Sequence, residues 1–554
     1  MKADNTQTKN KPKNKRSLAL SYTSLPIVLA FYYAIVVNIP LYNDFYKILS
    51  GLDNVHISFI IAIPLFIFLL NSIIFSVFSW PYIGKPIFAL LLITSSMVSY
   101  VMLFYGINVD YGMIENAFET DVSEAASYLN LHSFTWVTIT GVIPAILVAL
   151  VPMKPGLGLL KKAISIITLF ALLLFLLFFT YKDFSAVGRN NSYLKKMILP
   201  GYYVYSTYHY VRDTYFSTPM TFKHIGEDAK IVVKNADPKV NEKPTLFFFI
   251  LGETARSQNY ALNGYAKNTN PYTEKQDVIS FQSVHSCGTA TAVSVPCMFS
   301  QQGRHDYDKQ RSYNQDNALD ILQRAGVSLL WKENDGGDKE VAKRIPKVQI
   351  DRSHDNQFCN GGTCLDMALL QGLDSEINAM KGNEKLVVMH LMGSHGPTYY
   401  LRYPKAQQKF LPDCQSSEIE NCSTDQIVNT YDNTIVYTDY VVSQAIDKLK
   451  ALSNQYNTAL LYLSDHGESL GENGLYLHGV PYAVAPDFQT TVPLILWMSD
   501  GFKKSKNIDE SCLKKAAKNG DFSQDYVFSS LLGIMDVQTT AYDKNLDIYH
   551  ACRS

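Results

Sequence analysis

Three short stretches of the chain gather acidic and histidine side chains directly after largely apolar runs of strand length. Gly252-Glu253-Thr254 follows Thr245–Leu251, Gly393-Ser394-His395-Gly396 follows Lys385–Leu391, and Ser464-Asp465-His466-Gly467-Glu468 follows Thr458–Leu463. Such runs are typical of strands buried on both faces of a parallel sheet. Open α/β sheets bind ligands at the carboxyl ends of their strands. We therefore expect these acidic and histidine side chains to meet at one edge of a sheet.

The side chains at this edge are of the types that bind a divalent metal. Carboxylates and imidazoles together suit Zn²⁺ or Mn²⁺, and the candidate ligands are Glu253, His395, Asp465 and His466. A further histidine, His478, follows twelve residues after His466. Any one of these residues is more often a helix cap, a solvated loop residue or a satisfied core group. Their combination at predicted strand ends favours a metal site, whereas we assign structural roles to the lone His305, His354 and His390.

A metal of this kind can activate a hydroxyl nucleophile, and the segment between Cys287 and Cys297 offers three. Thr289, Thr291 and Ser294 are all candidates. An alcohol reacts poorly at its own pKa, and coordination to a divalent cation lowers that pKa. The alternative interpretation is a Ser/Thr-rich loop held by a disulfide.

The elements that must position these residues belong to an α/β layered domain. Helix-like segments such as Asp316–Ala325 and Thr434–Leu452 alternate with the apolar runs, as in a sheet covered by helices. With 554 residues the chain is long enough for two or three units. Its net charge of −1 gives no reason to expect a nucleic-acid partner.

The cysteines indicate an oxidising compartment. All eight lie in the C-terminal part, and no CxxC metal motif is present. Three close pairs are Cys287–Cys297, Cys359–Cys364 and Cys414–Cys422, and elimination leaves Cys512–Cys552 as the fourth. Disulfides explain this usage better than metal binding.

The N-terminal third is predicted to cross a membrane five times. Five stretches lack Asp, Glu, Lys and Arg for about the 20 residues that a bilayer requires. They are Ser24–Tyr42, Ile57–Ser79, Pro86–Tyr105, Phe134–Met153 and Ala163–Tyr181. No cleavage site follows the first, so we interpret it as an anchor.

The distribution of Lys and Arg between the loops predicts the orientation of the membrane part. The tail before residue 17 carries six Lys and Arg residues, and Lys85, Lys154, Lys161 and Lys162 fall on the same side. The opposite loop, Gly106–Ser133, holds five acidic residues and no Lys or Arg. The positive-inside rule therefore puts the N-terminus in the cytoplasm and the C-terminal domain outside it.

The predicted organisation has three parts: a membrane domain at 1–182, a linker at 183–230 and an α/β domain at 231–554. Seven tyrosines with interspersed Lys and Arg mark the linker. Aromatic rings with polar tips favour the headgroup zone, so we expect the linker along the membrane surface. A soluble aromatic connector is the alternative.

Several long motifs resemble those of the lipid A phosphoethanolamine transferase family, within the alkaline phosphatase superfamily. They are GETARSQNYALNGY (252–265), SCGTATAVSVPCMFS (286–300), WKENDGG (331–337), HLMGSHGPTYYLRYP (390–404) and SDHGESLGENGLYLHG (464–479). The resemblance spans nearly the whole chain. It implies an alkaline-phosphatase-like domain with a mainly parallel sheet between helical layers, joined to a five-helix membrane domain in the bacterial inner membrane, with the catalytic domain in the periplasm.

The resemblance also implies roles for individual residues. Thr291 is the implied nucleophile, with Glu253, Thr291, Asp465 and His466 around a catalytic zinc. His395 and His478 bind a second zinc or stabilise the phosphoryl group and handle protons. Asn116, Thr120 and Glu124 match the family's MIxN…T…E pattern for the phosphoethanolamine head group. An ordinary acidic outer loop is the alternative.

One departure from the family concerns the segment after WKENDGG. The family often has Cys-Lys-Gly-Val-Cys where this chain reads Asp338-Lys339-Glu340-Val341-Ala342. One family disulfide is therefore absent. Lys339 is retained as a candidate phosphate contact, with Glu340 in place of glycine beside it.

The implied reaction is transfer of phosphoethanolamine from phosphatidylethanolamine to a phosphate of lipid A through a covalent threonine intermediate, which in the family gives resistance to polymyxin. A monomer is expected. Within the family the acceptor can instead be a core sugar or a periplasmic glucan. A glycerophosphate transferase of the lipoteichoic-acid-synthase type and a non-catalytic membrane sensor are the competing hypotheses. A sulfatase is disfavoured, because the loop lacks a Cys/Ser-x-Pro-x-Arg segment.

Overall fold

A computed structural model describes residues 19–50, 57–119, 129–154, 158–216, 220–232, 243–360, 362–417 and 419–553. The chain divides into two compact units that are not continuous in sequence. The first comprises Met1–Leu103 and Ser133–Val204, and the second Phe104–His132 and Tyr205–Ser554. The loop between two predicted spans, at 104–132, therefore groups with the C-terminal unit.

The first unit is built from long apolar helices. Four are long and apolar enough to cross a membrane: α3 (Ile57–Phe78), α4 (Gly84–Phe104), the continuous run Leu131–Leu150 and the first part of α9 (Leu159–Asn190). The remaining predicted span is bent by 53° between Ser24–Val37 and α2 (Ile39–Ser50). Pro40 explains the break, because a proline in a helix removes a main-chain hydrogen bond. The five predicted stretches are thus helical, and the bent pair is the fifth span if it crosses as one.

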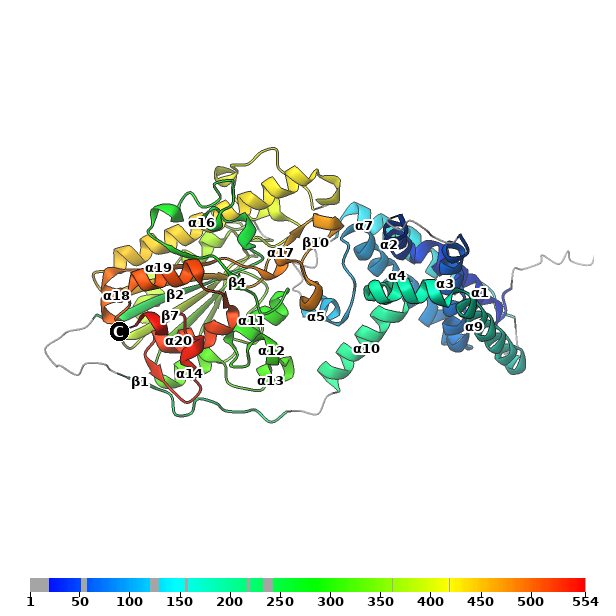
Figure 1. The fold of residues 1–554 in the computed structure, drawn as a ribbon, viewed down its shortest axis with the longest axis horizontal. Helices are drawn as coiled ribbons and strands as arrows, with labels where there is room; N and C mark the ends of the chain where they lie inside the picture. The colour runs from blue at the N-terminus through cyan, green and yellow to red at the C-terminus, as the bar shows by residue number, and fades with distance from the viewer. Residues whose placement is uncertain are drawn as a thin grey trace, which may run out of the picture. The chain divides into compact units, whose positions relative to one another are not determined.

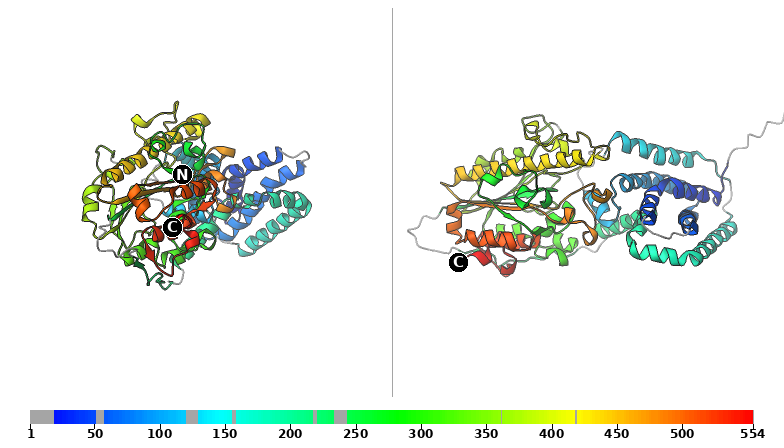
Figure 2. Two further views of the ribbon diagram at one scale, coloured as in Figure 1. Left: turned by 60° about the vertical axis from the view of Figure 1, so that its left-hand side comes forward. Right: turned by 45° about the horizontal axis from the view of Figure 1, so that its top comes forward.

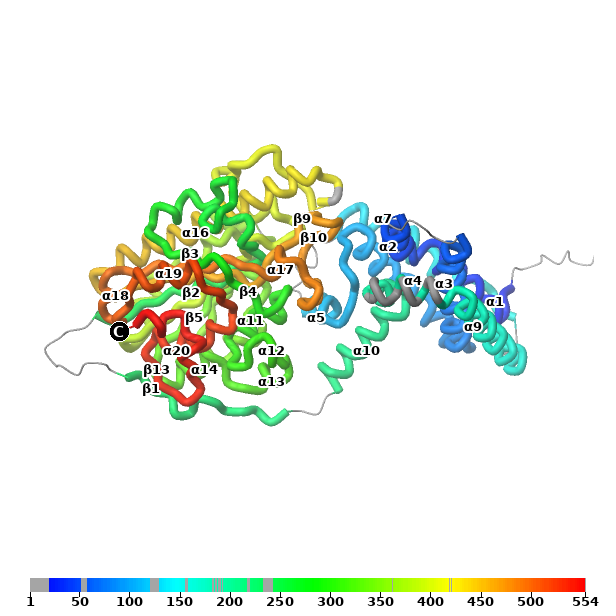
Figure 3. Tube along the Cα trace, in the orientation of Figure 1, coloured from blue at the N-terminus to red at the C-terminus, as the bar shows by residue number. Residues whose placement is uncertain are grey.

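A short helix from the acidic loop forms part of the second unit. In α5 (Tyr111–Glu119) the carboxylates of Glu115 and Glu119 pair with the Lys309 ammonium, at 2.9 Å for Glu115. Nearby, the Tyr476 N–H donates to the Tyr105 carbonyl at 3.1 Å. The Cα trace in Figure 3 shows α5 next to β10 (Tyr476–Leu477). The described part of this loop is therefore held against the rest of the second unit by ion pairs and by a main-chain hydrogen bond.

The second unit is organised around a seven-stranded sheet. Its order is β3 (Ile279–Phe281), β11 (Leu494–Met498), β8 (Asn457–Ser464), β2 (Thr245–Gly252), β7 (Glu384–His390), β5 (Ser328–Glu333) and β6 (Lys347–Gln349). The neighbouring strands from β8 to β6 are parallel, and β11 runs antiparallel to both its neighbours. The predicted mainly parallel sheet is confirmed.

Helices cover both faces of the sheet (Figures 1 and 2). On one face, alternate residues of β2 (Phe247, Phe249 and Leu251) enter a core built with α11 (Thr291–Phe299), α14 (Ala318–Ala325) and α20 (Val527–Ile534). The long α16 (Thr424–Leu452) covers the other face. The fully buried strands explain why the sequence shows continuous apolar runs instead of alternation.

Four disulfides hold the second unit, and they are the four predicted pairs. They join Cys287–Cys297, Cys359–Cys364, Cys414–Cys422 and Cys512–Cys552. The segment Asp338–Ala342 is held by polar contacts of Asp338, here called the polar clip. The Asp338 carboxylate accepts the Ala342 N–H at 2.8 Å and pairs with the Lys347 ammonium at 2.8 Å.

Candidate metal centre and nucleophile

The register of two central strands brings the principal acidic residues together. In the parallel pair β2 and β8, Gly252 lies opposite Ser464. The next residues, Glu253 and Asp465, therefore leave the sheet at the same level, and His466 follows. All three side chains are completely buried. Strand pairing alone thus places two carboxylates and an imidazole at the carboxyl edge of the sheet, as the sequence predicts.

Thr291, the first residue of α11, supplies a hydroxyl to the same point. Its Oγ1 lies 3.2 and 3.4 Å from the two carboxylate oxygens of Glu253 and 3.4 Å from Nε2 of His466. His466 Nε2 is in turn 3.4 Å from Glu253 Oε1 and 3.2 Å from Asp465 Oδ2. These atoms approach one another more closely than unrelated side chains do, although most of the distances are long for hydrogen bonds.

Hydrogen bonds outside the cluster orient these donors. Nδ1 of His466 lies 2.9 Å from the Gly467 carbonyl, so it carries the proton and leaves the Nε2 lone pair facing the cluster. Asp465 Oδ1 accepts from the main-chain N–H groups of Thr254 and His466. Among the residues that the structure describes, Asp465 Oδ2 has no hydrogen-bond partner. Burying a carboxylate oxygen without a partner costs free energy, and a bound cation would remove that cost.

The spacing of the donors fits a tetrahedral cation. Zn²⁺ binds nitrogen and oxygen at about 2.0–2.2 Å, and a tetrahedron with bonds of that length has edges of about 3.3–3.6 Å. The separations of 3.2–3.4 Å among the Glu253, Thr291, Asp465 and His466 donors match the lower end of that range. The donor set of two carboxylates, one imidazole and one hydroxyl is also one that Zn²⁺ accepts.

Burial changes the proton affinities of the cluster. Burial, and then the Asp465 charge, raises the pKa of Glu253 to about 8. Burial, and then His478, lowers the pKa of His466 to about 4, so this imidazole is neutral at ordinary pH. Carboxylates that resist ionisation and an imidazole that resists protonation are expected where a cation is needed to complete the site.

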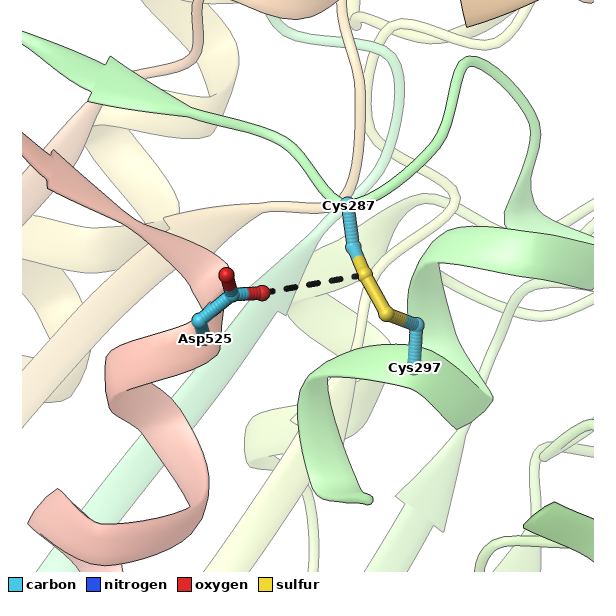
Figure 4. Close-up of side chains that lie close together, drawn as sticks. All are labelled: Cys287, Cys297 and Asp525. Carbon is cyan, nitrogen blue, oxygen red and sulfur yellow. Dashed lines mark hydrogen bonds between the residues drawn. A yellow bond between two sulfur atoms is a disulfide. The ribbon is translucent and has the colours of Figure 1, made fainter. Parts of the chain in front are cut away.

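The geometry distinguishes the three candidate hydroxyls of the nucleophile loop. Thr289 donates to the Val480 carbonyl at 2.6 Å, and Ser294 accepts the Gly288 N–H at 2.9 Å. Only Thr291, of these three, contacts Glu253 and His466. The Cys287–Cys297 disulfide joins the loop to α11, and Asp525 lies 4.0 Å from the Cys287 sulfur (Figure 4). Both cysteines are oxidised and have no thiolate to offer a metal. The group of Cys287, Cys297 and Asp525 is therefore a disulfide with a carboxylate beside it, and not a metal site.

Two further histidines lie beside the centre. The ring of His478 is 4.5 Å from that of His466 and 5.5 Å from that of His395, measured between centroids, and His395 and His478 are both buried. Sequence reasoning missed the role of Glu468 in this group. Its carboxylate lies 3.5 Å from Nδ1 of His478, and although burial lowers the pKa of His478, Glu468 raises it above its usual value. The available signal was its position two residues after His466, within the same motif.

The predicted head-group residues are only partly placed. Asn116 lies on α5, whereas Thr120 and Glu124 fall outside the described residues. Lys339 contacts the Glu119 carbonyl at the end of α5, at 3.4 Å. On the same helix, the carboxylates of Glu115 and Glu119 are paired with the Lys309 ammonium.

Comparison with known proteins supplies the identification. The sulfatase family model matches residues 245–537, and the model of the phosphoethanolamine transferases EptA and EptB matches residues 67–215. Phosphoethanolamine transferase EptA of Escherichia coli K12 is 38% identical over 95% of this chain and 96% of its own length. The chain belongs to the phosphoethanolamine transferase family. It is therefore an enzyme with an N-terminal membrane part.

Two other relatives of this transferase extend the comparison. The integral membrane lipooligosaccharide phosphoethanolamine transferase A of Neisseria meningitidis superimposes with a TM-score of 0.91 at 34% identity, covering 97% of this chain and 99% of that one. Phosphatidylethanolamine transferase Mcr-1 of Escherichia coli is 38% identical over 80% of this chain and 84% of its own. The resemblance noted in the sequence motifs is confirmed over both parts of the transferase.

Proposed function

We propose that this transferase moves phosphoethanolamine from phosphatidylethanolamine to a phosphate of lipid A, through a covalent intermediate on Thr291. The observation that carries this proposal is the placement of Thr291 Oγ1 within 3.2–3.4 Å of Glu253 and His466, at a strand edge where a buried Asp465 oxygen faces the same point. The names of relatives that act on lipid A support the acceptor.

Glu253, Asp465, His466 and Thr291 are the residues that would hold a zinc ion. When bound, the ion lowers the pKa of the threonine hydroxyl and neutralises charge on the phosphoryl oxygens. Fixed carboxylates and a fixed imidazole keep the hydroxyl in one place, so little reorganisation is needed at the moment of reaction. Both effects depend on the short donor separations measured at the centre.

The transfer takes place in two displacements. Thr291 Oγ1 gives up its proton to water and forms a bond to phosphorus, and the bond from phosphorus to the glycerol oxygen breaks. His478, with its raised pKa, gives a proton to that oxygen and diacylglycerol leaves. A phosphate oxygen of lipid A then forms a bond to phosphorus, and the bond from phosphorus to Thr291 Oγ1 breaks. Thr291 and His478 each recover a proton from water, which restores the starting state. Positioning and charge neutralisation dominate such phosphoryl transfers.

The remaining residues bind the substrates. Thr291 begins α11, whose N-terminal end favours a negatively charged phosphoryl group. His395 lies with His478 beside the centre and stabilises the phosphoryl oxygens. Asn116, Thr120 and Glu124 contact the ethanolamine head group, and Lys339 contacts phosphate. We place the N-terminus in the cytoplasm and the catalytic unit in the periplasm, because the positive charges of the loops favour that orientation.

Release of diacylglycerol from a fluorescent phosphatidylethanolamine tests the donor and the nucleophile. The purified full-length enzyme in detergent is expected to release it, and Thr291→Ala to abolish release, whereas Thr291→Ser retains a hydroxyl and part of the rate. The matched control is Thr289→Ala, whose hydroxyl donates to the Val480 carbonyl. It is expected to lower the rate far less. Full activity of Thr291→Ala contradicts the nucleophile assignment.

Mass spectrometry of lipid A from cells that express the enzyme tests the acceptor. A phosphoethanolamine added to lipid A, absent in cells with Thr291→Ala, supports the proposal. Covering a phosphate with a cationic amine weakens the binding of cationic peptides, so the same cells are expected to survive more polymyxin. If the added mass is on a core sugar or a glucan and lipid A is unchanged, the lipid A acceptor is contradicted and the sugar or glucan is the acceptor.

A further inference from the structure

A second group of buried polar side chains lies on the other side of Glu253, at the same edge of the sheet. Strand pairing sets it up, because His390 at the end of β7 is opposite Leu251 in β2 and opposite Glu333 in β5. Glu333 and His390 are completely buried, and Asp335 is 4% exposed. Glu253, Asp335 and His390 each contribute one possible ligand atom, and these three atoms lie within 4.8 Å of one another.

The ring of His390 is held in one orientation. Its Nδ1 lies 3.0 Å from Glu333 Oε2. Glu333 is itself fixed, because it accepts from Nε1 of Trp331 at 2.9 Å and from the main-chain N–H of Asp335 at 2.7 Å. A carboxylate that binds one imidazole nitrogen and thereby aims the other at a cation is the usual arrangement around metal-binding histidines.

The other nitrogen of His390 points at carboxylates without bonding to them. Among the described residues Nε2 has no hydrogen-bond partner, and Asp335 Oδ2 lies 3.8 Å away. This distance is too long for a hydrogen bond. It is a distance that two bonds of about 2.1 Å to a common cation span at a wide angle. Burying an imidazole nitrogen without any partner is otherwise unfavourable.

We propose that Glu253, Asp335 and His390 bind a second divalent cation, Zn²⁺ or Mn²⁺, and that Glu253 bridges it to the catalytic centre. One imidazole and two carboxylates form a donor set that both ions accept. The inference goes beyond the proposed transfer reaction, since it holds whichever group is transferred. It also gives His390 a metal-binding role, whereas the sequence alone predicts a structural one.

The charges of the buried cluster support a second cation. One divalent ion at the catalytic centre balances Glu253 and Asp465. Glu333 and Asp335 then leave two further negative charges in a region that is almost inaccessible to water. Unbalanced buried carboxylates are costly, and a second divalent ion balances both. A proton on His390 is the competing way to lower this charge, and the two are distinguished by counting metal.

Metal counting on the full-length enzyme tests the proposal. The detergent-purified protein is stripped with a chelator, reloaded with Zn²⁺, desalted and analysed by plasma mass spectrometry. We expect His390→Gln and Asp335→Asn each to hold one zinc fewer per chain than the wild type. Equal zinc content in the wild type and both variants overturns the proposal, and assigns His390 to a protonated ion pair.

A matched variant and a second measurement guard against misfolding. Asp465→Asn breaks the catalytic centre and is expected to keep the second ion. Asp335→Asn nearly preserves shape, and a gel-filtration profile like that of the wild type shows that it is folded. Loading with Mn²⁺ adds an independent signal, because two ions that share the Glu253 carboxylate show exchange coupling by electron paramagnetic resonance. A coupled signal that persists in Asp335→Asn contradicts the site.

This experiment separates failure of the inference from failure of the proposed function. Loss of the second zinc in the variants stands even if diacylglycerol release turns out not to depend on Thr291. A wild-type enzyme that transfers phosphoethanolamine with the same zinc content as His390→Gln refutes only the second site.

Discussion

The two sides of Glu253 share a carboxylate but differ in what faces it. Toward β8 lie Asp465, His466 and the hydroxyl of Thr291, 3.2 Å from the Glu253 carboxylate. Toward β5 lie Asp335 and His390, whose ring is oriented by Glu333. We propose that the first side activates a nucleophile. The second side has the donors for a cation, and we expect that cation to balance charge and to hold Glu253.

Replacing the shared residue has the largest expected effect. Glu253→Gln removes one charge from both sides, and an amide bridges two cations poorly. We expect the zinc content to fall at both sites and the rate of diacylglycerol release to drop by more than about 10³-fold, since loss of even one group that stabilises charge in a transition state costs about 10²–10³-fold. Zinc content and release rate are measured on the same preparation.

Single-side variants provide the contrast for this prediction. Asp465→Asn is expected to reduce release about as much as Glu253→Gln, while Asp335→Asn reduces it by about 10–100-fold, the range for groups that support a metal indirectly. If Glu253→Gln lowers the zinc content no more than Asp465→Asn does, Glu253 does not bridge, and the comparison of the two sides fails.

The catalytic side was predictable from sequence because its signals are local. Glu253 and the Asp465-His466 pair each follow a continuous apolar run, and the rule that ligands bind at strand carboxyl ends brings them together. The choice of Thr291 over Thr289 and Ser294 was not predictable from composition. It depends on where α11 begins, since the first helical residue faces the strand edge while its neighbours turn to the Val480 carbonyl and the Gly288 N–H.

The second side was not predictable, because it depends on register between distant strands. His390 is the last residue of β7, within the apolar run itself, and a lone histidine there is usually a core residue. Its significance arises only when β5 and β2 pair on either side of it and bring Glu333 opposite. Gly393 carries a similar non-local constraint, because a Cβ there would meet the Glu253 carbonyl oxygen at 2.5 Å with φ at +52°.

The pH dependence of zinc binding distinguishes the two sides. At the catalytic side, burial raises the pKa of Glu253 to about 8, while His466, at about 4, stays neutral. Zinc needs the ionised carboxylate, so below pH 8 its affinity is expected to fall about tenfold per pH unit and above pH 8 to level off. At the second side burial would lower the pKa of His390, but Glu333 and Asp335 raise it to about 10. Zinc must displace that proton, so affinity there keeps rising above pH 8.

Zinc titrations against a competing chelator at pH 6, 7, 8 and 9 measure both sites. Asp335→Asn reports the catalytic site alone, and Asp465→Asn reports the second site alone. Between pH 8 and 9 we expect a gain of about 10–20-fold in Asp465→Asn, where His390 and the shared Glu253 both lose a proton, and less than about twofold in Asp335→Asn. Identical slopes in the two variants contradict the assignment of separate titrating groups to the two sides.

The smallest expected effect comes from the polar clip formed by Asp338. Asp338 closes the turn after Asp335 by accepting the Ala342 N–H, and its partner Lys347 is 39% exposed, so that ion pair adds little. Asp338→Ala is expected to cost about 1 kcal/mol and to lower the melting temperature of the full-length enzyme by about 2 °C. Because this turn begins three residues after Asp335 and contains no ligand of the catalytic side, zinc affinity is expected to weaken about tenfold at the second site only. Asp351→Ala, which removes a similar acceptor of the Ser353 N–H in an exposed turn, is the control. An equal loss of zinc affinity at both sites in Asp338→Ala shows that the two sides respond as one unit.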